Sequence, residues 1–195
     1  MAELGIIAPQ RPQNVLGLIQ QLDEDSNDGI TEVARSALLS LSAQLNSLAQ
    51  EIRTLDHKIL TWHRSSETSQ RLATIPGVGV LTATAMAASV TDPSLFRSGR
   101  QFGAFLGLVP RQNSSGGKER LGRITKMGDG YLRKLLVVGA TAILRRVADT
   151  QTRTANWIRS LLERKAPRLV SVAMANKTAR IIWALLARGG TYRAA

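Results

Sequence analysis

The strongest constraint on this chain is a run of apolar residues spaced alternately three and four positions apart. The run comprises Leu38, Leu41, Leu45, Leu48, Ile52, Leu55, Ile59 and Trp62. This spacing puts every member on one seam of an α-helix, the pattern of a coiled coil. We therefore predict a coiled-coil helix over residues 31–67, paired with a second copy of the chain or with another helix of the same chain. A core helix of one globular domain is the alternative.

Basic residues are concentrated after this seam. Residues 1–70 contain five Lys or Arg and nine Asp or Glu, whereas residues 71–195 contain 21 Lys or Arg and five Asp or Glu. Such an asymmetry favours a polyanionic partner bound mainly by the second part of the chain. A generally basic surface is the alternative. Binding to an anionic membrane is disfavoured because the basic residues do not form one amphipathic helix.

Composition excludes several kinds of chemistry. Cysteine is absent, so disulfides and thiolate catalysis are excluded. His57 and His63 are six residues apart, on roughly opposite sides of the helix, and we expect both to be solvated. A two-metal nuclease needs several converging carboxylates. Those of the basic part are scattered, so we expect no metal site in this chain; they are Asp92, Glu119, Asp129, Asp149 and Glu163.

No apolar run approaches the roughly 20 residues that span a bilayer, and residues 1–14 lack the pattern of a secretory signal. We expect a cytoplasmic protein of a prokaryote, associated with the nucleoid and not with a membrane. The predicted fold is mainly α. A loop and short helix occupy residues 1–30, and a compact helical domain occupies residues 68–195.

A helix-hairpin-helix pattern begins this domain, at about residues 71–90. Pro76, Gly77 and Gly79 interrupt the helical pattern, and an apolar helix follows from about Leu81. Glycines in such a turn allow a phosphate to approach the backbone, and the next helix presents unpaired N–H groups and its positive dipole end. Gly77 and Gly79 are therefore candidate phosphate contacts. A tight turn between packed helices explains them equally well.

Residues 106–130 contain a second candidate site, the serine loop, and a short β-hairpin is compatible with residues 106–126. Ser115 precedes Gly116 and Gly117, which leave room for a phosphate beside the hydroxyl. Attack by a serine on a phosphodiester also requires cations to neutralise the developing charge. Those available here are Lys118, Arg120, Arg123, Lys126, Arg133 and Lys134. No general base is evident, and read alone this stretch is most often a linker.

Helices are predicted for residues 131–190. The first runs from Asp129 to about Asp149, and the last contains Asn176, Lys177 and Arg180 within an otherwise apolar pattern.

Three segments, in this order, resemble the transposases of insertion-sequence family 110/1111, whose relatives are the Piv-type DNA invertases. They are RLATIPGVGVLTATAMAA, FRSGRQFGAFLGLVPRQNSSGGKERLGRITKMGDGYLRKLLVVGA and ANKTARIIWALLARGGTYR. The similarity extends from about Leu4 to Arg193. Its central part, Leu106 to Arg133, is highly specific, whereas the other two segments are weaker alone.

The resemblance implies a site and partners. Members of this family carry a nucleophilic serine in a Ser-Gly-Gly-Lys motif, which corresponds here to Ser115, Gly116, Gly117 and Lys118; Ser114 is the less favoured candidate. They form a covalent 5′-phosphoserine link to DNA. They act as oligomers guided by a bridge RNA. The resemblance also implies an N-terminal domain, similar to the Holliday-junction resolvase RuvC, whose DEDD carboxylates bind Mg²⁺.

That carboxylate domain has no counterpart in this sequence. We therefore expect a C-terminal part of a transposase that binds DNA, cannot cleave it alone, and holds no Mg²⁺ itself. The competing prediction is a non-catalytic DNA- or RNA-binding module that oligomerises through its coiled coil. A purely structural protein is the third.

Overall fold

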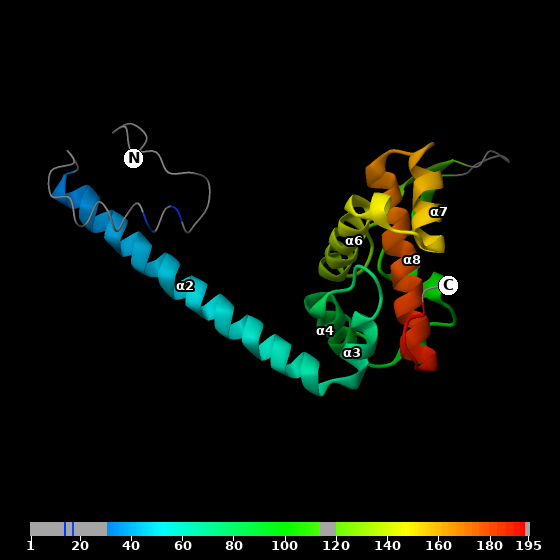
Figure 1. Cartoon of the computed structure of the whole chain (residues 1–195), viewed down its shortest axis with the longest axis horizontal. Helices are drawn as coiled ribbons and strands as arrows, with labels where there is room; N and C mark the ends of the chain where they lie inside the picture. Colours follow the sequence, from blue (N-terminus) through cyan, green and yellow to red (C-terminus); the bar gives the residue numbers. More distant parts are fainter. Residues whose placement is uncertain (1–13, 15–16, 18–30, 114–119, 194–195) are drawn as a thin grey trace. The chain divides into compact units, whose positions relative to one another are not determined.

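A computed structural model describes residues 14, 17, 31–113 and 120–193 of the chain (Figure 1). The chain divides into two units, one ending at Lys58 and the other beginning at Ile59. The predicted loop and short helix of residues 1–30 fall almost entirely outside the described residues.

The apolar seam lies on one continuous helix, α2, which spans Glu32–Ser65. Its N-terminus begins beside Thr31, whose hydroxyl accepts a hydrogen bond from the Ala34 N–H. Most of the seam is exposed: Leu48 is 55% exposed and Ile52 is 58% exposed, whereas Leu38 and Ile59 are partly buried. The helix is thus confirmed, while its pairing into a coiled coil stays a prediction.

Short helices and one hairpin make up the second unit. Their bounds are α3 Glu67–Ala73, α4 Val80–Ser89, η2 Pro93–Leu95, α5 Gly99–Phe105, β1 Pro110–Gln112, β2 Leu121–Ile124, α6 Gly130–Arg145, η3 Val147–Asp149, α7 Arg153–Leu162 and α8 Pro167–Arg188. The prediction of a mainly α fold with a short hairpin is confirmed.

The junction between α2 and α3 depends on polar contacts. The Ser66 hydroxyl caps α3 by accepting from the Ser69 N–H. The Ser69 side chain is fully buried, and its hydroxyl lies 2.7 Å from His63 Nδ1. Because a buried hydroxyl needs a hydrogen-bond partner, this contact with His63 stabilises the junction. His63 is therefore partly buried, whereas we expected it to be solvated.

Helix α8 is the element on which the second unit is assembled. It contacts α6, α5, α7, α3 and η2, and Figure 1 shows it running beside α6 and α7. Five apolar side chains along it are fully buried: Val170, Met174, Ala175, Ala179 and Ile182. Burial of each large aliphatic side chain stabilises the fold by about 1.5–3 kcal/mol.

The apolar character of α8 comes from this packing. Among the described helices it alone combines the length and the mean hydropathy, 1.3, that a membrane span requires. A buried core helix meets the same criteria, and α8 also carries Lys177 and Arg180 among its apolar residues.

Helix α6 ends four residues earlier than the sequence predicts. It stops at Arg145, and η3 continues to Asp149. Two carbonyl groups of this turn accept hydrogen bonds from α7: Arg159 Nη1 donates to the Val147 oxygen at 3.1 Å and to the Thr150 oxygen at 3.2 Å.

The turn between α3 and α4 is pressed against α6. Gly77 has a φ of 78°, and a Cβ on it would lie 2.6 Å from Ile143 Cδ1 and 2.9 Å from the Gly139 oxygen. A Cβ on Gly139 would collide in turn with the Gly77 oxygen. Only glycine fits at both positions, so the packed-turn interpretation accounts for Gly77.

We predict that Gly77→Ala lowers the free energy of unfolding by roughly 2–4 kcal/mol, from left-handed strain and overpacking combined. Urea unfolding followed by the fluorescence of Trp157 and Trp183 measures this. Gly79→Ala is the matched control, because a Cβ there has no neighbour within 4 Å and the decrease should stay below about 1 kcal/mol. Equal decreases in both variants would contradict the packing explanation.

Candidate nucleic-acid interface

The serine loop contains an antiparallel hairpin, whose strands β1 and β2 come before and after residues 113–120 in the sequence. Pro110 pairs with Ile124 and Gln112 with Leu121, with an irregularity between the two pairs. One step further, the Asn113 N–H donates to the Arg120 oxygen at 2.8 Å. Residues 114–119 fall outside the described part of the structure, so it tests none of the roles predicted for Ser114, Ser115, Gly116, Gly117 and Lys118.

Two glycines let the base of the hairpin close on itself. Gly107 and Gly128 have φ values of 68° and 75°. A Cβ on Gly107 would collide with the Met127 oxygen, and one on Gly128 with the Phe105 oxygen. Lys126, also left-handed with a φ of 56°, donates its N–H to the Gly107 oxygen at 3.2 Å. The base of the hairpin is therefore held by backbone contacts.

Arg133 fastens this base to α6. Its Nη1 donates to the carbonyl oxygens of Leu106 and Met127, each at 3.0 Å. We predicted a phosphate contact for Arg133, and the structure places its guanidinium in this structural role. Asp129 caps the same helix, accepting from the N–H groups of Tyr131 and Leu132.

The two predicted phosphate-binding segments meet different parts of α6. The hairpin base contacts it at Arg133, and the glycine turn contacts it at Gly139. These positions are about 9 Å apart along the helix axis, at 1.5 Å per residue. Gly79, next to the turn, is the N-cap of α4 and faces open space.

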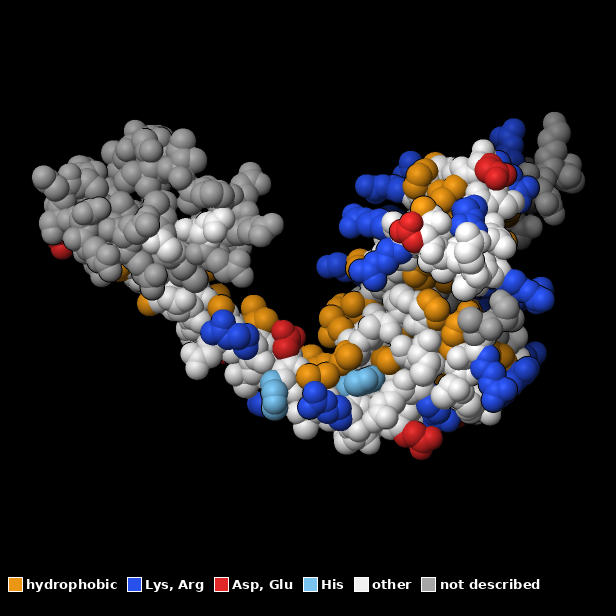
Figure 2. Space-filling model, in the orientation of Figure 1, with side chains coloured by type: hydrophobic (Ala, Val, Ile, Leu, Met, Phe, Trp, Pro, Cys, Tyr) orange, Lys and Arg blue, Asp and Glu red, His pale blue; other side chains and the backbone are white. Residues whose placement is uncertain are grey.

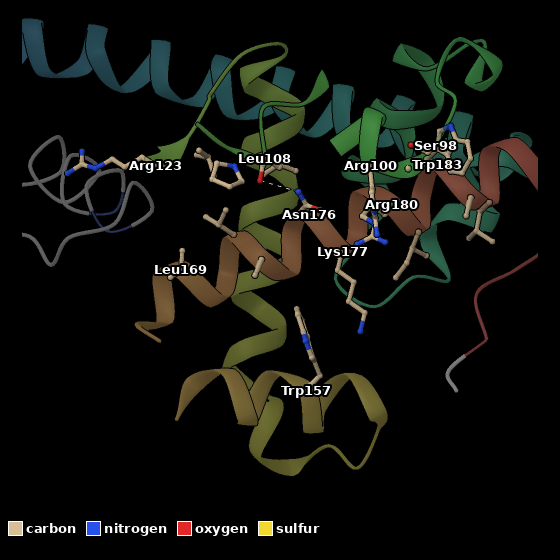
Figure 3. Close-up of a pocket in the computed structure, with 18 of the residues that line it drawn as sticks. Ser98, Arg100, Leu108, Arg123, Trp157, Leu169, Asn176, Lys177, Arg180 and Trp183 are labelled. Atoms are coloured by element: carbon tan, nitrogen blue, oxygen red, sulfur yellow. Dashed lines mark hydrogen bonds between the residues drawn. The ribbon is translucent and has the colours of Figure 1, made fainter. Parts of the chain in front are cut away.

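An open groove of about 1130 Å³ runs along α8. Its walls come from the start of α5, the hairpin, α7 and α8 (Figure 3). Five cationic residues line it: Arg100, Arg123, Lys177, Arg180 and Arg188. No acidic residue is among the described residues that line it.

Of the predicted cations, only Arg123 lines this groove; Arg120 and Lys126 are exposed elsewhere on the hairpin. Arg100 and Arg188 were missed. The signal for the α8 part was present, since Asn176, Lys177 and Arg180 interrupt an apolar helix. Figure 2 shows many Lys and Arg side chains on the visible face of the second unit and few carboxylates.

Two polar contacts order the middle of the groove. Lys177 Nζ lies 4.6 Å from the centroid of the Trp157 ring, a cation–π contact between α8 and α7. Asn176 Nδ2 donates to the Leu108 oxygen at 3.1 Å and so ties α8 to the segment leading into the hairpin. Figure 3 shows both residues on the groove-facing side of α8.

Among the described residues, few acidic side chains lie in the second unit, and none belongs to a cluster that could hold a metal ion. The Ser94 hydroxyl and N–H donate to Asp92, which lowers the pKa of that carboxyl below its usual range. No three His, Cys, Asp or Glu side chains converge within residues 31–113 and 120–193. The described residues therefore do not form a magnesium centre.

The described residues that line the groove thus include five cations and no carboxylate, which makes this surface positively charged. Residues 69–156 match the model of the transposase IS116/IS110/IS902 family. The chain is 43% identical over 194 residues to a Sinorhizobium fredii protein whose name assigns it as transposase y4pF/y4sB. It is 43% identical over 165 residues to the transposase for insertion sequence element IS1111A of Coxiella burnetii, and 39% over 155 residues to that for IS1328 of Yersinia enterocolitica.

These matches cover 99%, 85% and 80% of this chain. The chain is thus similar to transposases of this kind along most of its length. It spans about half the length of the relatives it matches, with shares of 50%, 45% and 46% for these three.

We predict that Arg133→Lys loosens the base of the hairpin, because one ammonium group cannot reproduce the arginine contact with both carbonyls. Hydrogen exchange at the N–H groups of Thr125 and Lys126 should accelerate roughly tenfold or more, the equivalent of about 1.4 kcal/mol. Lys134→Arg, at the exposed neighbouring position, should leave both rates unchanged. Unaltered exchange in the Arg133 variant would contradict the structural role.

Proposed function

We propose that this chain supplies the strand-cleaving and strand-joining serine of a DNA transposase, with Ser115 as the nucleophile. The observation that supports the proposal is the arrangement of the two strands on either side of residues 114–119. Glycine contacts close the base of their hairpin, Arg133 ties that base to α6, and β2 contributes Arg123 to the cationic groove.

The proposed chemistry is the one that the resemblance implies. The Ser115 oxygen attacks the phosphorus of a phosphodiester, and the bond from phosphorus to the 3′ oxygen breaks. The serine proton is removed and the 3′ oxygen ends as a hydroxyl, leaving a 5′-phosphoserine link. Cations around the loop stabilise the charge on the five-coordinate phosphorus. The reverse attack by a 3′ hydroxyl restores the DNA without ATP, because the ester bond is conserved.

Further features of the proposal come from the resemblance. A bridge RNA selects the DNA sites, and Mg²⁺ is held by carboxylates outside this chain, so no step here uses a metal bound by its described residues. The turn before α4 acts as a helix-hairpin-helix contact at Gly79, where no side chain caps the helix and a Cβ would have no neighbour within 4 Å. We expect the protein to act in the cytoplasm on nucleoid DNA. The relation to Piv-type invertases stays a prediction.

The nucleophile is tested in a chimera. Residues 1–195 replace the matching half of the Sinorhizobium fredii relative, and the product is incubated with element-end DNA, bridge RNA and Mg²⁺. A protein–DNA adduct should form, and mass spectrometry should find the phosphate on Ser115. Ser115→Ala should reduce the adduct roughly 1000-fold or more, as removal of a nucleophile does in other enzymes.

Ser114→Ala is the matched control, a neighbouring serine with the same chemical change, and should leave most of the adduct. Adduct that persists in the Ser115 variant and vanishes in the Ser114 variant would move the nucleophile to Ser114. DNA binding without an adduct in every variant would favour the non-catalytic binding module.

A second proposed function is self-association through α2. The seam itself favours it. Six of its eight apolar side chains are exposed, and Leu38 and Ile59 are partly exposed. A seam of this length buries its apolar side chains when two such helices pair.

We predict that the unmodified chain sediments as an oligomer and that Leu48→Glu shifts it toward the monomer, by at least roughly tenfold in dissociation constant. Analytical ultracentrifugation measures this. Ser47→Glu adds the same charge one position away on the polar side and should have little effect. A monomeric unmodified chain, or equal shifts in both variants, would contradict pairing through the seam.

A further inference from the structure

The groove along α8 is lined by both cationic and apolar side chains, which would contact different parts of one ligand. Its lining residues include the five cations and three apolar residues with exposed or partly exposed side chains, Leu169, Val172 and Ile181, which we call the apolar floor. At about 1130 Å³ it exceeds the roughly 300–1000 Å³ of most small-molecule pockets. An extended ligand suits this size better than a metabolite.

Two arginines of the groove are placed near one another by helix packing. Gly99 lies so close to α8 that a Cβ on it would be 3.1 Å from the Cα and the carbonyl oxygen of Arg180. Arg100 follows Gly99 directly and faces the same groove (Figure 3). Neither arginine forms an ion pair with an acidic residue in the described part of the chain. Uncompensated like charges in one groove favour an anionic ligand.

Lys177 adds a third cation at a defined position. Its contact with the Trp157 ring holds the ammonium group between α8 and α7, inside the same groove. Three cations from α5 and α8 thus gather toward one end of the groove, and Leu169 lies toward the other (Figure 3). A row of separated anionic groups, as in a nucleic-acid backbone, matches this arrangement.

The apolar floor favours a single-stranded nucleic acid over a duplex. A DNA duplex presents phosphates and sugars outward and keeps its bases stacked inside, so it has no apolar face to place on Leu169, Val172 and Ile181. Unpaired bases have exposed faces that pack on apolar and aromatic side chains, and proteins that bind single strands pair such a platform with a cationic groove.

We propose that this groove binds a single strand of DNA, with Arg100, Lys177 and Arg180 on its phosphates and the apolar floor against its unpaired bases. The proposal rests on the proposed function insofar as it assumes that DNA is the ligand. The strand that binds is the one that separates from its complement near the hairpin. Gly122 and Arg123 of β2 belong to the lining of the groove, so the groove reaches the hairpin.

The test measures binding of a fluorescein-labelled dT12 to the full 195-residue chain by anisotropy over a range of salt concentrations. The double variant Arg100→Gln, Arg180→Gln should bind at least tenfold more weakly. Its log–log salt dependence should be shallower by about 1.4, because each phosphate of a single strand that the protein neutralises contributes roughly 0.7 to the slope.

Arg145→Gln, Arg146→Gln is the matched control. It removes the same charge from exposed residues at the end of α6 that do not line the groove, and its affinity should fall less than threefold. Circular dichroism establishes that both double variants are folded. An equal decrease in both would overturn the groove assignment and indicate a general electrostatic effect.

Three ligands test the rest of the proposal. A 12-base-pair duplex and an abasic 12-mer should each bind at least tenfold more weakly than dT12, the first because its bases are paired and the second because it has none. Equal binding of either would overturn the role of the apolar floor. Tighter binding of rU12 than of dT12 would overturn the assignment to DNA.

The binding test is separate from the test of the nucleophile. Ser115→Ala should keep its affinity for dT12 within twofold, because Ser115 is not one of the groove residues. Loss of the covalent adduct with dT12 binding intact supports both proposals. An adduct that forms normally in the Arg100, Arg180 variant would overturn the groove alone.

Discussion

Backbone contacts that exclude any side chain determine where the functional segments of this protein lie. Gly77 meets Gly139, residues 105–107 cross residues 126–128 at Gly107 and Gly128, and Gly99 lies against the backbone of α8. The first contact places the α3–α4 turn on α6, the second closes the base of the hairpin, and the third brings Arg100 beside Arg180. A backbone held by such contacts has little freedom to shift, which suits a site that must meet a phosphate at a defined distance.

Charge in this protein is organised around α8. The helix buries one face in the core, and Asn176, Lys177 and Arg180 line the groove, where Asn176 holds the segment leading into the hairpin and Lys177 contacts the ring of Trp157. The same helix is therefore both the centre of the fold and one wall of the candidate site. Under the proposed role of the groove, a substitution on the polar face of α8 is expected to weaken binding, whereas one at the buried Val170 or Ile182 is expected to lower stability first.

Much of this could be read from the sequence. The heptad seam predicts α2, the glycines at 77 and 79 predict the turn before α4, and the position of the short hairpin was anticipated. Each of these rests on residues close together in the chain. The groove was not anticipated, because its cations come from positions as far apart as Arg100 and Arg188, and only the approach of α5 to α8 brings them together. His63 was misjudged for a similar reason, since its partner Ser69 is buried by other elements.

By itself, the sequence determined the mainly helical fold and the similarity of the chain to a group of transposases, and it singled out Ser115 as a candidate nucleophile. These properties depend on local periodicity and on motifs of adjacent residues. Only the tertiary structure decided that Arg133 holds two carbonyls, that Gly77 serves helix packing, and that Arg100, Lys177 and Arg180 share one groove. The physical reason is that a side chain's function depends on which distant elements pack beside it, and close packing at the glycines selects those neighbours.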